Sequence, residues 1–271
     1  MNYINTINDG NNIDKNNSDK NITSSILDNY ILLKQKVEQI ATYSTDTTTP
    51  IKIIAISKKI STDAIEFLYN AGQLAFGENY FNEFKYKTTK LKHLDIEWHF
   101  IGTLQSNKLK HLVGNADWVH SLEKPHHAIK LNQLLDKYAH SQNNMNNSNS
   151  NSSIINNKIA PLNVLIEVNI SHEINKHGVK NFTEIVELAN LITQQPYLNF
   201  RGLMGMASNT QDINIQINQF NELTNIFNSL KQHGFPNIDT ISMGMSNDYV
   251  SAIKCGATMV RIGSKIFGER L

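Results

Sequence analysis

The chain has 271 residues, with 25 basic and 24 acidic side chains, a net charge of +1 and a single cysteine, Cys255. This balance lacks the basic surplus of nucleic-acid-binding proteins, and one cysteine excludes a disulfide framework and a cysteine-based zinc site. No apolar run has the length of a membrane span, and residues 1–21 lack the apolar core of a signal peptide, so we expect a cytoplasmic protein.

Two Asn-rich segments differ in composition from the rest of the chain. Residues 1–22 and 141–157 are polar and carry few large apolar side chains. Such segments bury too little apolar surface to offset the entropy lost on ordering. We therefore predict a disordered tail at 1–22 and a low-complexity insertion at about 141–157. Because the insertion lies between two regularly patterned elements, residues 23–271 are predicted to form one domain.

The rest of the chain alternates between helical and extended patterns. Apolar residues recur at helical spacing near residues 23–43, 61–71, 80–93, 105–113, 124–140, 180–194, 213–233 and 247–255. Short apolar runs typical of strands lie at 51–57, 74–77, 96–101, 117–121, 162–170, 200–205, 238–243 and 258–262. Eight strands interleaved with helices predict a closed (β/α)8 barrel, with the helix at 23–43 completing the outer ring. The alternative is an open doubly wound sheet, but its Gly-rich fingerprint is missing after the first strand.

A lysine stands at the end of the first predicted strand. Side chains alternate between the faces of a strand, so if Ile54 and Ile56 pack inside the barrel, Lys58 reaches its mouth and Lys59 points outward. Active sites of such barrels lie at the carboxyl ends of the strands. A buried lysine amine loses its proton more readily and can form an imine with a carbonyl group. The alternative is a Lys58 side chain that simply extends into water.

Small residues follow the last two predicted strands, in the loops that often bind phosphate in barrel proteins. Gly244 and Ser246 follow the seventh strand, and Gly263 and Ser264 follow the eighth. Glycines let the backbone approach an anion, and hydroxyl groups and helix amides can donate to it. Alternatively, Ser246 is a helix N-cap and the glycines are turn residues. A lysine amine facing a phosphate site suggests a sugar-phosphate aldolase or a pyridoxal phosphate (PLP) protein.

Eight motifs spread over the chain from the first strand onward carry a family resemblance. They are IIAISK (53–58), FGENYFNE (76–83), WHFIGTLQSNK (98–108), NVLIEVNIS (163–171), KHGV (176–179), RGLM (201–204), SMGMSNDYVSAI (242–253) and GATMVRIGSKIFGER (256–270). In this order they resemble the pyridoxal phosphate homeostasis protein family. The departures are Thr103, Gly205-Met206 and the Asn/Ser-rich insertion, which concern the rim of the site.

The resemblance implies both a fold and a cofactor. The fold would be a single (β/α)8 barrel of the type found in the N-terminal domain of alanine racemase, and PLP would be held as a Schiff base on Lys58. Asn79 would lie beside the cofactor, and Arg261 would lie at its pyridine ring. The phosphate would be contacted by Ser246, Gly263 and Ser264, which agrees with the loops identified from the strand pattern.

The arginine at the ring bears on whether the protein is an enzyme. PLP supports carbanion chemistry when its ring nitrogen is protonated, and a guanidinium facing that nitrogen disfavours the proton. Related racemases take a second catalytic base from a C-terminal domain, for which this chain leaves no residues. We therefore expect a protein of intracellular PLP (vitamin B6) homeostasis without efficient catalysis, although Lys58 could support weak one-base exchange. The alternative is a PLP-dependent amino-acid racemase or a related enzyme.

Further expectations concern partners and two polar side chains. The expected partners are PLP and, as recipients, apo forms of PLP-dependent enzymes, for a monomer or weak dimer that binds neither nucleic acid nor membrane. None of the ten histidines has a metal-ligand spacing such as HExxH, so we expect no metal. His99 is either a core histidine or a neighbour of the cofactor ring. Glu78 either orients Lys58 or caps the following helix.

Overall fold

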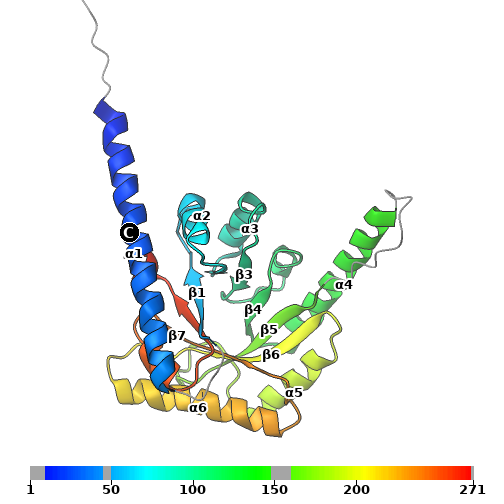
Figure 1. Cartoon of the computed structure of the whole chain (residues 1–271). Helices are drawn as coiled ribbons and strands as arrows, with labels where there is room; N and C mark the ends of the chain where they lie inside the picture. Colours follow the sequence, from blue (N-terminus) through cyan, green and yellow to red (C-terminus); the bar gives the residue numbers. More distant parts are fainter. Residues whose placement is uncertain (1–9, 45–49, 148–159, 270–271) are drawn as a thin grey trace, which may run out of the picture.

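Eight parallel strands form a closed barrel and follow one another in chain order (Figure 1). The structure is a computed structural model that describes residues 10–44, 50–147 and 160–269. Strand β8 pairs with β1, so the predicted closed barrel is confirmed and the open sheet is wrong. The strands are β1 Lys52–Ile56, β2 Ala75–Glu78, β3 Glu97–Phe100, β4 Trp118–Leu122, β5 Leu162–Val168, β6 Leu198–Gly205, β7 Thr240–Met245 and β8 Met259–Ile262.

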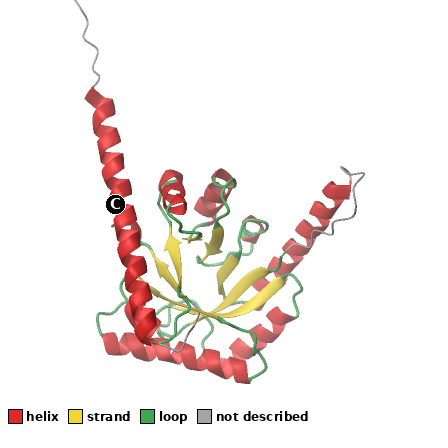
Figure 2. Cartoon of the chain, in the orientation of Figure 1, coloured by secondary structure: helices red, strands yellow, loops and turns green. Residues whose placement is uncertain are grey.

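Helices surround this barrel (Figure 2). Several begin where the sequence supplies a polar cap: Ser61 accepts from the amide of Ala64, and Asn181 from that of Glu184. No helix in the described part of the chain is long and apolar enough to cross a membrane. The helices are α1 Gly10–Ser44, α2 Thr62–Asn70, α3 Phe81–Lys90, α4 Pro125–Asn147, α5 Phe182–Thr193, α6 Ile213–Gln232, α7 Tyr249–Lys254 and α8 Ser264–Phe267.

The helix predicted between β3 and β4 is much shorter than expected. Only a 3-10 turn, Leu109–His111, is found where the pattern predicted a helix over 105–113. The two buried leucines, Leu109 and Leu112, are three residues apart, a spacing that fits a 3-10 turn as well as an α-helix. The turn is held by a hydrogen bond from the Leu112 amide to the Leu109 carbonyl, 3.0 Å long.

Helix α1 completes the outer ring, as the sequence analysis predicted. It contacts α8, α7 and α2, the helices on either side of the point where the barrel closes. Its buried side chains recur every three or four residues and so form one stripe that faces the barrel. They are Ile26, Tyr30, Leu33, Val37 and Ile40.

Two helices extend into segments that the sequence analysis assigned otherwise. The backbone of residues 10–22 continues α1 where a disordered tail was expected, and α4 takes in residues 141–147 of the expected insertion. Both helix ends project beyond the barrel in Figure 1. The physical reason is that a packed helix is already nucleated, so polar residues can extend it without burial. The remaining parts of the two predicted segments, 1–9 and 148–157, lie outside the described residues.

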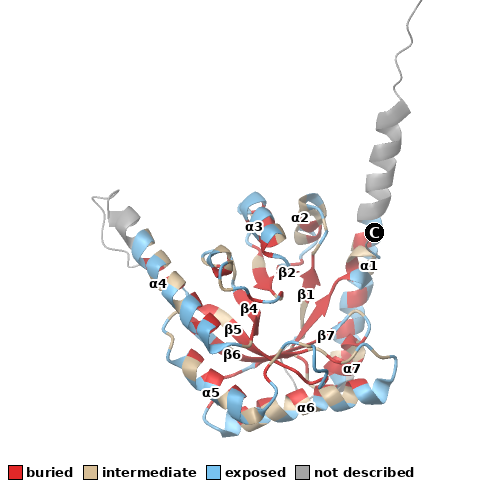
Figure 3. Ribbon diagram, turned by 180° about the vertical axis from the view of Figure 1, so that it is seen from behind, coloured by how far each residue is buried: buried red, intermediate tan, exposed pale blue. Residues whose placement is uncertain are grey.

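Buried residues gather on the strands and on the helices that cover them (Figure 3). Their side chains form two layers, one inside the barrel and one between the strands and the helices. The outer layer is the larger hydrophobic cluster and includes Phe76, Phe84 and Phe100. The inner layer is small and contains Ile54, Ile56, Ala75, Trp118, Leu165, Met204 and Met259. Because Ile54 and Ile56 face inward, strand alternation directs Lys58 toward the barrel mouth.

Candidate functional site

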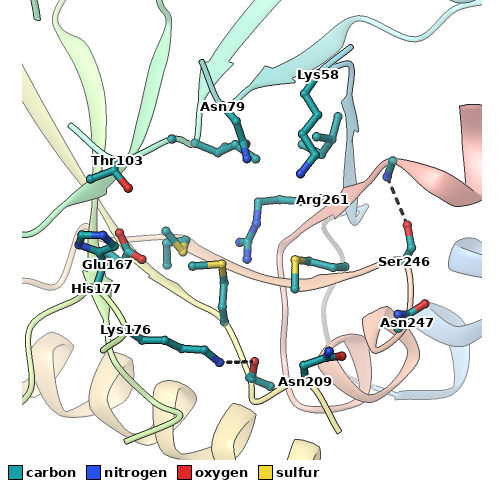
Figure 4. Close-up of a pocket in the computed structure, with 18 of the residues that line it drawn as sticks. Lys58, Asn79, Thr103, Glu167, Lys176, His177, Asn209, Ser246, Asn247 and Arg261 are labelled. Atoms are coloured by element: carbon teal, nitrogen blue, oxygen red, sulfur yellow. Dashed lines mark hydrogen bonds between the residues drawn. The ribbon is translucent and has the colours of Figure 1, made fainter. Parts of the chain in front are cut away.

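A cavity of about 1200 Å³ opens at the carboxyl ends of the strands. This is the end of a (β/α)8 barrel at which active sites lie. Figure 4 shows side chains from several strand ends that point into it. Of the seven residues that the sequence analysis proposed, six line the cavity: Lys58, Asn79, Ser246, Arg261, Gly263 and Ser264. The seventh, Gly244, does not appear in the cavity lining and has a structural role described below.

Lys58 and Lys59 take the opposite directions that the strand pattern predicted. Lys58 lines the cavity, whereas Lys59 is exposed and has a φ of 60°. This left-handed conformation is uncommon for a residue with a side chain and turns the chain sharply after β1. The strand register therefore selects Lys58 as the amine available inside the pocket.

A buried ion cluster lies directly behind Lys58. The amine of Lys87, on α3, is 2.7 Å from Glu78 Oε1 and 2.8 Å from Glu83 Oε2, and it also donates to the Ser57 carbonyl at 2.7 Å. Burial raises the pKa of the Glu78 carboxyl, while Lys87 and Ser57 act in the opposite direction. This cluster is buried against the backbone on which Lys58 stands.

The same cluster fixes both neighbours of Lys58. The Ser57 hydroxyl donates to Glu78 Oε1 at 2.6 Å, and the Lys59 amide donates to Glu83 Oε2 at 2.6 Å. Of the two alternatives left open, Glu78 does not cap α3, whose N-cap residue is Tyr80, and it orients Lys58 only indirectly, through Ser57 and Lys87. It holds the backbone that carries Lys58.

The loops after β7 and β8 meet beside the cavity. The amide of Gly263 donates to Ser246 Oγ at 3.3 Å, so the two predicted phosphate loops touch. Helix α7 begins at Tyr249 and is preceded by Asp248, so the alternative of Ser246 as an N-cap is wrong. Ser246 is left with its hydroxyl at the cavity wall.

Gly244 makes the turn from β7 toward α7. Its φ is +89°, a region that side chains disfavour. A Cβ atom at this position would lie 2.6 Å from the Cβ of Ala252 and 3.0 Å from the Cα of Tyr249. Gly244 therefore makes the turn that places the Ser246 loop, and it does not line the cavity.

Arg261 projects from β8 into the centre of the pocket (Figure 4). Its guanidinium donates to the Ser242 carbonyl at 2.8 Å, to Ser242 Oγ at 2.7 Å and to the Gly205 carbonyl at 3.1 Å. Burial lowers the pKa of Arg261 to about 10, although Asp248 and Glu167 act in the opposite direction. The side chain therefore stays charged at neutral pH and is held by three hydrogen bonds.

Asn79 offers an unsatisfied polar atom at the same pocket. Its Oδ1 is buried and has no hydrogen-bond partner within the described part of the chain. Buried polar atoms are nearly always paired, so an unpaired one beside a cavity indicates a missing ligand or water. Asn79 is held close to the next strand end because Gly102 has no side chain, where a Cβ would collide with the Asn79 carbonyl.

Three further residues, Glu167, Lys176 and His177, line the pocket on the side opposite Ser246 (Figure 4), and the sequence analysis did not propose them as site residues. Glu167 is the penultimate residue of β5, and only 5% of its surface is exposed. Burial, together with Glu123, raises the pKa of its carboxyl to about 7, although His177 and Arg261 act in the opposite direction. Lys176 donates to the Ala207 carbonyl at 3.4 Å. A signal was available, because alternation from the inward-facing Leu165 places Glu167 at the mouth.

His99 is a core histidine. It is fully buried inside the barrel, its ring stacks on Trp118, and its Nδ1 is 2.9 Å from Nε2 of His120. It does not line the cavity at the mouth. No group of three or more histidine, cysteine, aspartate or glutamate side chains that could hold a metal ion was found among the described residues.

The chemistry of the pocket suits PLP. One cavity brings together the amine of Lys58, the unpaired amide oxygen of Asn79 and the guanidinium of Arg261. The hydroxyl groups of Ser246 and Ser264 lie at the loops after β7 and β8. An amine for an aldehyde, a donor for a ring nitrogen and hydroxyls for a phosphate are the groups that such a cofactor requires.

Comparisons with known proteins point in the same direction. The family model described as "Alanine racemase, N-terminal domain" matches residues 33–271. The pyridoxal phosphate homeostasis protein of Haemophilus influenzae is 40% identical over 250 residues, covering 91% of this chain and 96% of that protein. The protein of the same name from Escherichia coli is 35% identical over 250 residues, covering 91% and 97%. The structure of PipY from Synechococcus elongatus with PLP bound superposes with a TM-score of 0.71 at 26% identity, covering 90% of this chain and 100% of PipY.

Proposed function

This chain belongs to the pyridoxal phosphate homeostasis protein family, and from that premise we propose that it binds PLP at Lys58 and serves PLP homeostasis. The observation that carries the proposal is the convergence of Lys58 and Arg261 on one cavity whose rim is formed by the loops after β7 and β8. In such a site the Lys58 amine would bond to the aldehyde carbon. Ser246, Gly263 and Ser264 would hold the phosphate, and Asn79 would bind the ring from the side.

Arg261 supports a holding role over a catalytic one. PLP, when bound, can act as an electron sink for carbanion chemistry, and it does so best with a protonated ring nitrogen. Arg261 keeps its own charge and has only donors, so beside that nitrogen it would disfavour a proton there. We propose that the protein is not an efficient enzyme and that it passes PLP to apo forms of PLP-dependent enzymes in the cytoplasm, acting as a monomer or weak dimer.

Cofactor binding is tested by trapping the bond. Purified protein is mixed with PLP, reduced with borohydride and digested, and the modified peptide is identified by mass spectrometry. We expect the adduct on Lys58 and its loss in Lys58→Ala. Lys59→Ala is the matched control, because Lys59 is adjacent but exposed, and it should bind PLP as the unmodified chain does. A protein that retains no PLP absorption after unbound PLP has been removed would contradict the assignment.

The role is tested by separating release from turnover. PLP-loaded protein is mixed either with an apo-aminotransferase or with a panel of amino acids. We expect the aminotransferase to gain activity and the amino acids to keep their configuration at the sensitivity of chiral chromatography. Turnover at ordinary enzymatic rates, about 1–1000 per second, that disappears in Lys58→Ala would show that the protein is an enzyme.

A further inference from the structure

A line of polar side chains crosses the inside of the barrel from its amino-terminal end to Arg261. We call it the interior column; it consists of Lys52, Glu97, His99, His120, Ser242 and Arg261. The interior of such a barrel is usually filled by branched apolar side chains. Here His99, His120 and Ser242 have no exposed surface, so this chain has desolvated polar groups where apolar ones would pack.

The lower end of the column is an ion pair. Lys52 Nζ lies 2.8 Å from Glu97 Oε1 and 2.7 Å from Glu97 Oε2. The indole of Trp118 donates to Glu97 Oε1 at 2.6 Å. Burial alone would raise the pKa of Glu97, but His99 and Lys52 outweigh it and lower the pKa to about 2. Glu97 is therefore a fixed carboxylate at neutral pH.

The middle of the column connects this carboxylate to Arg261. Glu97 Oε1 is 3.6 Å from His99 Nε2, and His99 Nδ1 is 2.9 Å from His120 Nε2. His120 Nδ1 is 3.0 Å from Ser242 Oγ, which accepts from Arg261 Nη1 at 2.7 Å. One contact follows another from β3 through β4 and β7 to β8.

The two ends of the column determine where each proton lies. Arg261 has only donors, so the Ser242 hydroxyl accepts from it and keeps its own proton for His120 Nδ1. Glu97 has only acceptors and favours a proton on His99 Nε2, so a neutral His99 accepts at Nδ1 from His120. With both histidines neutral, each of the three hydrogen bonds from Arg261 to His99 has one proton. The His99 Nε2 proton then points toward Glu97 at 3.6 Å, an electrostatic contact and not a hydrogen bond, since Nε2 has no hydrogen-bond partner among the described residues. Burial lowers the pKa of both histidines, which supports their neutral form.

We infer that Ser242, His120 and His99 are positioning residues for Arg261, and that the column they form with Glu97 sets the electronic state of the cofactor at that arginine. This inference rests on the proposed function, because it takes PLP as the ligand that Arg261 faces. Arg261 has two further hydrogen bonds, to the carbonyls of Ser242 and Gly205, which fix its position but not the proton order. The column adds a fixed direction of hydrogen bonding that carbonyl groups alone do not supply.

The first test needs no cofactor. Nitrogen-15 NMR of histidine-labelled protein, assigned with single-histidine variants, reports the tautomer of each ring. We expect His99 and His120 to be neutral with the proton on Nε2. In Glu97→Gln, the acceptor-only end is lost and we expect a mixture of tautomers at His99. A charged ring, or the Nδ1–H tautomer at either histidine of the unmodified chain, would overturn the inference.

The second test measures the cofactor itself. PLP affinity and the absorption spectrum of the bound form are compared in Ser242→Ala, Glu97→Gln and Met259→Leu. We expect Ser242→Ala to lower the affinity about tenfold, as for loss of one hydrogen bond to a charged group. We also expect both column variants to change the ratio of the near-ultraviolet and visible bands. Met259→Leu is the control, because Met259 packs inside the barrel but is not part of the column.

The outcomes separate the two proposals. If the column variants bind PLP with unchanged affinity and spectrum, the column does not act on the cofactor and the inference is wrong. If the unmodified protein does not bind PLP at all, the proposed function fails, and the tautomers in the first test still decide whether the proton order exists. Glu97→Gln is remote from the cavity, so a spectral change in it cannot come from a lost contact with PLP.

Discussion

The two sides of the pocket differ in how their polar groups are held. On the anchor side, formed by the ends of β7, β8, β1 and β2, hydrogen bonds fix the backbone around Lys58 and join the Ser246 and Gly263 loops. On the far side, at the ends of β5 and β6, Lys176 is partly exposed and pairs with Glu173 only three residues away. A ligand therefore meets one preformed surface and one less firmly held surface, which agrees with the proposal that the protein both holds and releases a cofactor.

The largest effect should come from the buried lysine of the anchor side. Lys87→Met leaves the carboxylates of Glu78 and Glu83 without their cation, and we expect the free energy of unfolding to fall by about 3–5 kcal/mol. Urea denaturation measures this change. Lys85→Met, on an exposed position of the same helix, is the control and should change it by less than about 0.5 kcal/mol. If the two variants lowered the free energy of unfolding equally, the ion cluster behind Lys58 would not stabilise the anchor side.

A second prediction uses the buried carboxyl of the far side. The pKa of Glu167 is raised from 4.5 to about 7, so between these values the folded protein holds a proton that the unfolded chain has lost. The free energy of unfolding therefore falls as pH rises through this window and stays low above it. Glu167→Gln has no carboxyl to titrate and so does not show this decrease. Between pH 4 and pH 8, we therefore expect the free energy of unfolding of the variant to rise by up to about 3 kcal/mol relative to that of the unmodified chain. Urea denaturation of both proteins measures this difference. If the difference were the same at every pH, the prediction would be contradicted.

A third prediction concerns the turn of the anchor side. Gly244→Ala places a side chain at a φ of +89° and against Ala252. We expect the free energy of unfolding to fall by about 2 kcal/mol and PLP binding to weaken. Gly72→Ala is a matched control, because Gly72 also has a positive φ but has open space around it. For Gly72→Ala, we expect the free energy of unfolding to fall by about 1 kcal/mol and PLP binding to be unchanged. If both variants bind PLP normally, Gly244 does not position the Ser246 loop.

The smallest effect should come from the exposed lysine of the far side. Lys176→Met removes a pair with Glu173 whose side chains are 33% and 50% exposed. Solvent screens such pairs, so we expect the free energy of unfolding to change by less than about 1 kcal/mol. A loss as large as that of Lys87→Met would show that the far side is as firmly built as the anchor side.

The cavity-lining residues of the anchor side were predictable from sequence because they lie at or next to the ends of strands. Once Ile54 and Ile56 were taken as interior, period-2 alternation placed Lys58 in the pocket. Small residues after the last two strands indicated the two loops that we propose as the phosphate site. Arg261 and Asn79 came from the family motifs. The register of eight strands in a closed barrel left little freedom for these positions.

The rest depended on contacts between residues far apart in the chain. Nothing in the spacing of Lys87 and Glu78 shows that they meet behind Lys58, since this requires the packing of α3 on the barrel. Likewise, Ser242 and His120 are 122 residues apart and become neighbours only when the barrel closes. The length of α1 was also underestimated, since residues 10–22 were expected to be disordered. A polar composition indicates that a segment buries little apolar surface, but it does not exclude that the segment extends a helix already formed by its neighbours.

The position of α1 has a consequence for synthesis of the protein. Asn29, on this helix, donates to the carbonyl of Ile266, and the apolar stripe of α1 packs on α7 and α8. A ribosome makes α1 well before α7 and α8. The part of the stripe that packs on these two helices therefore stays uncovered until they are made, and an uncovered apolar surface favours aggregation of the nascent chain.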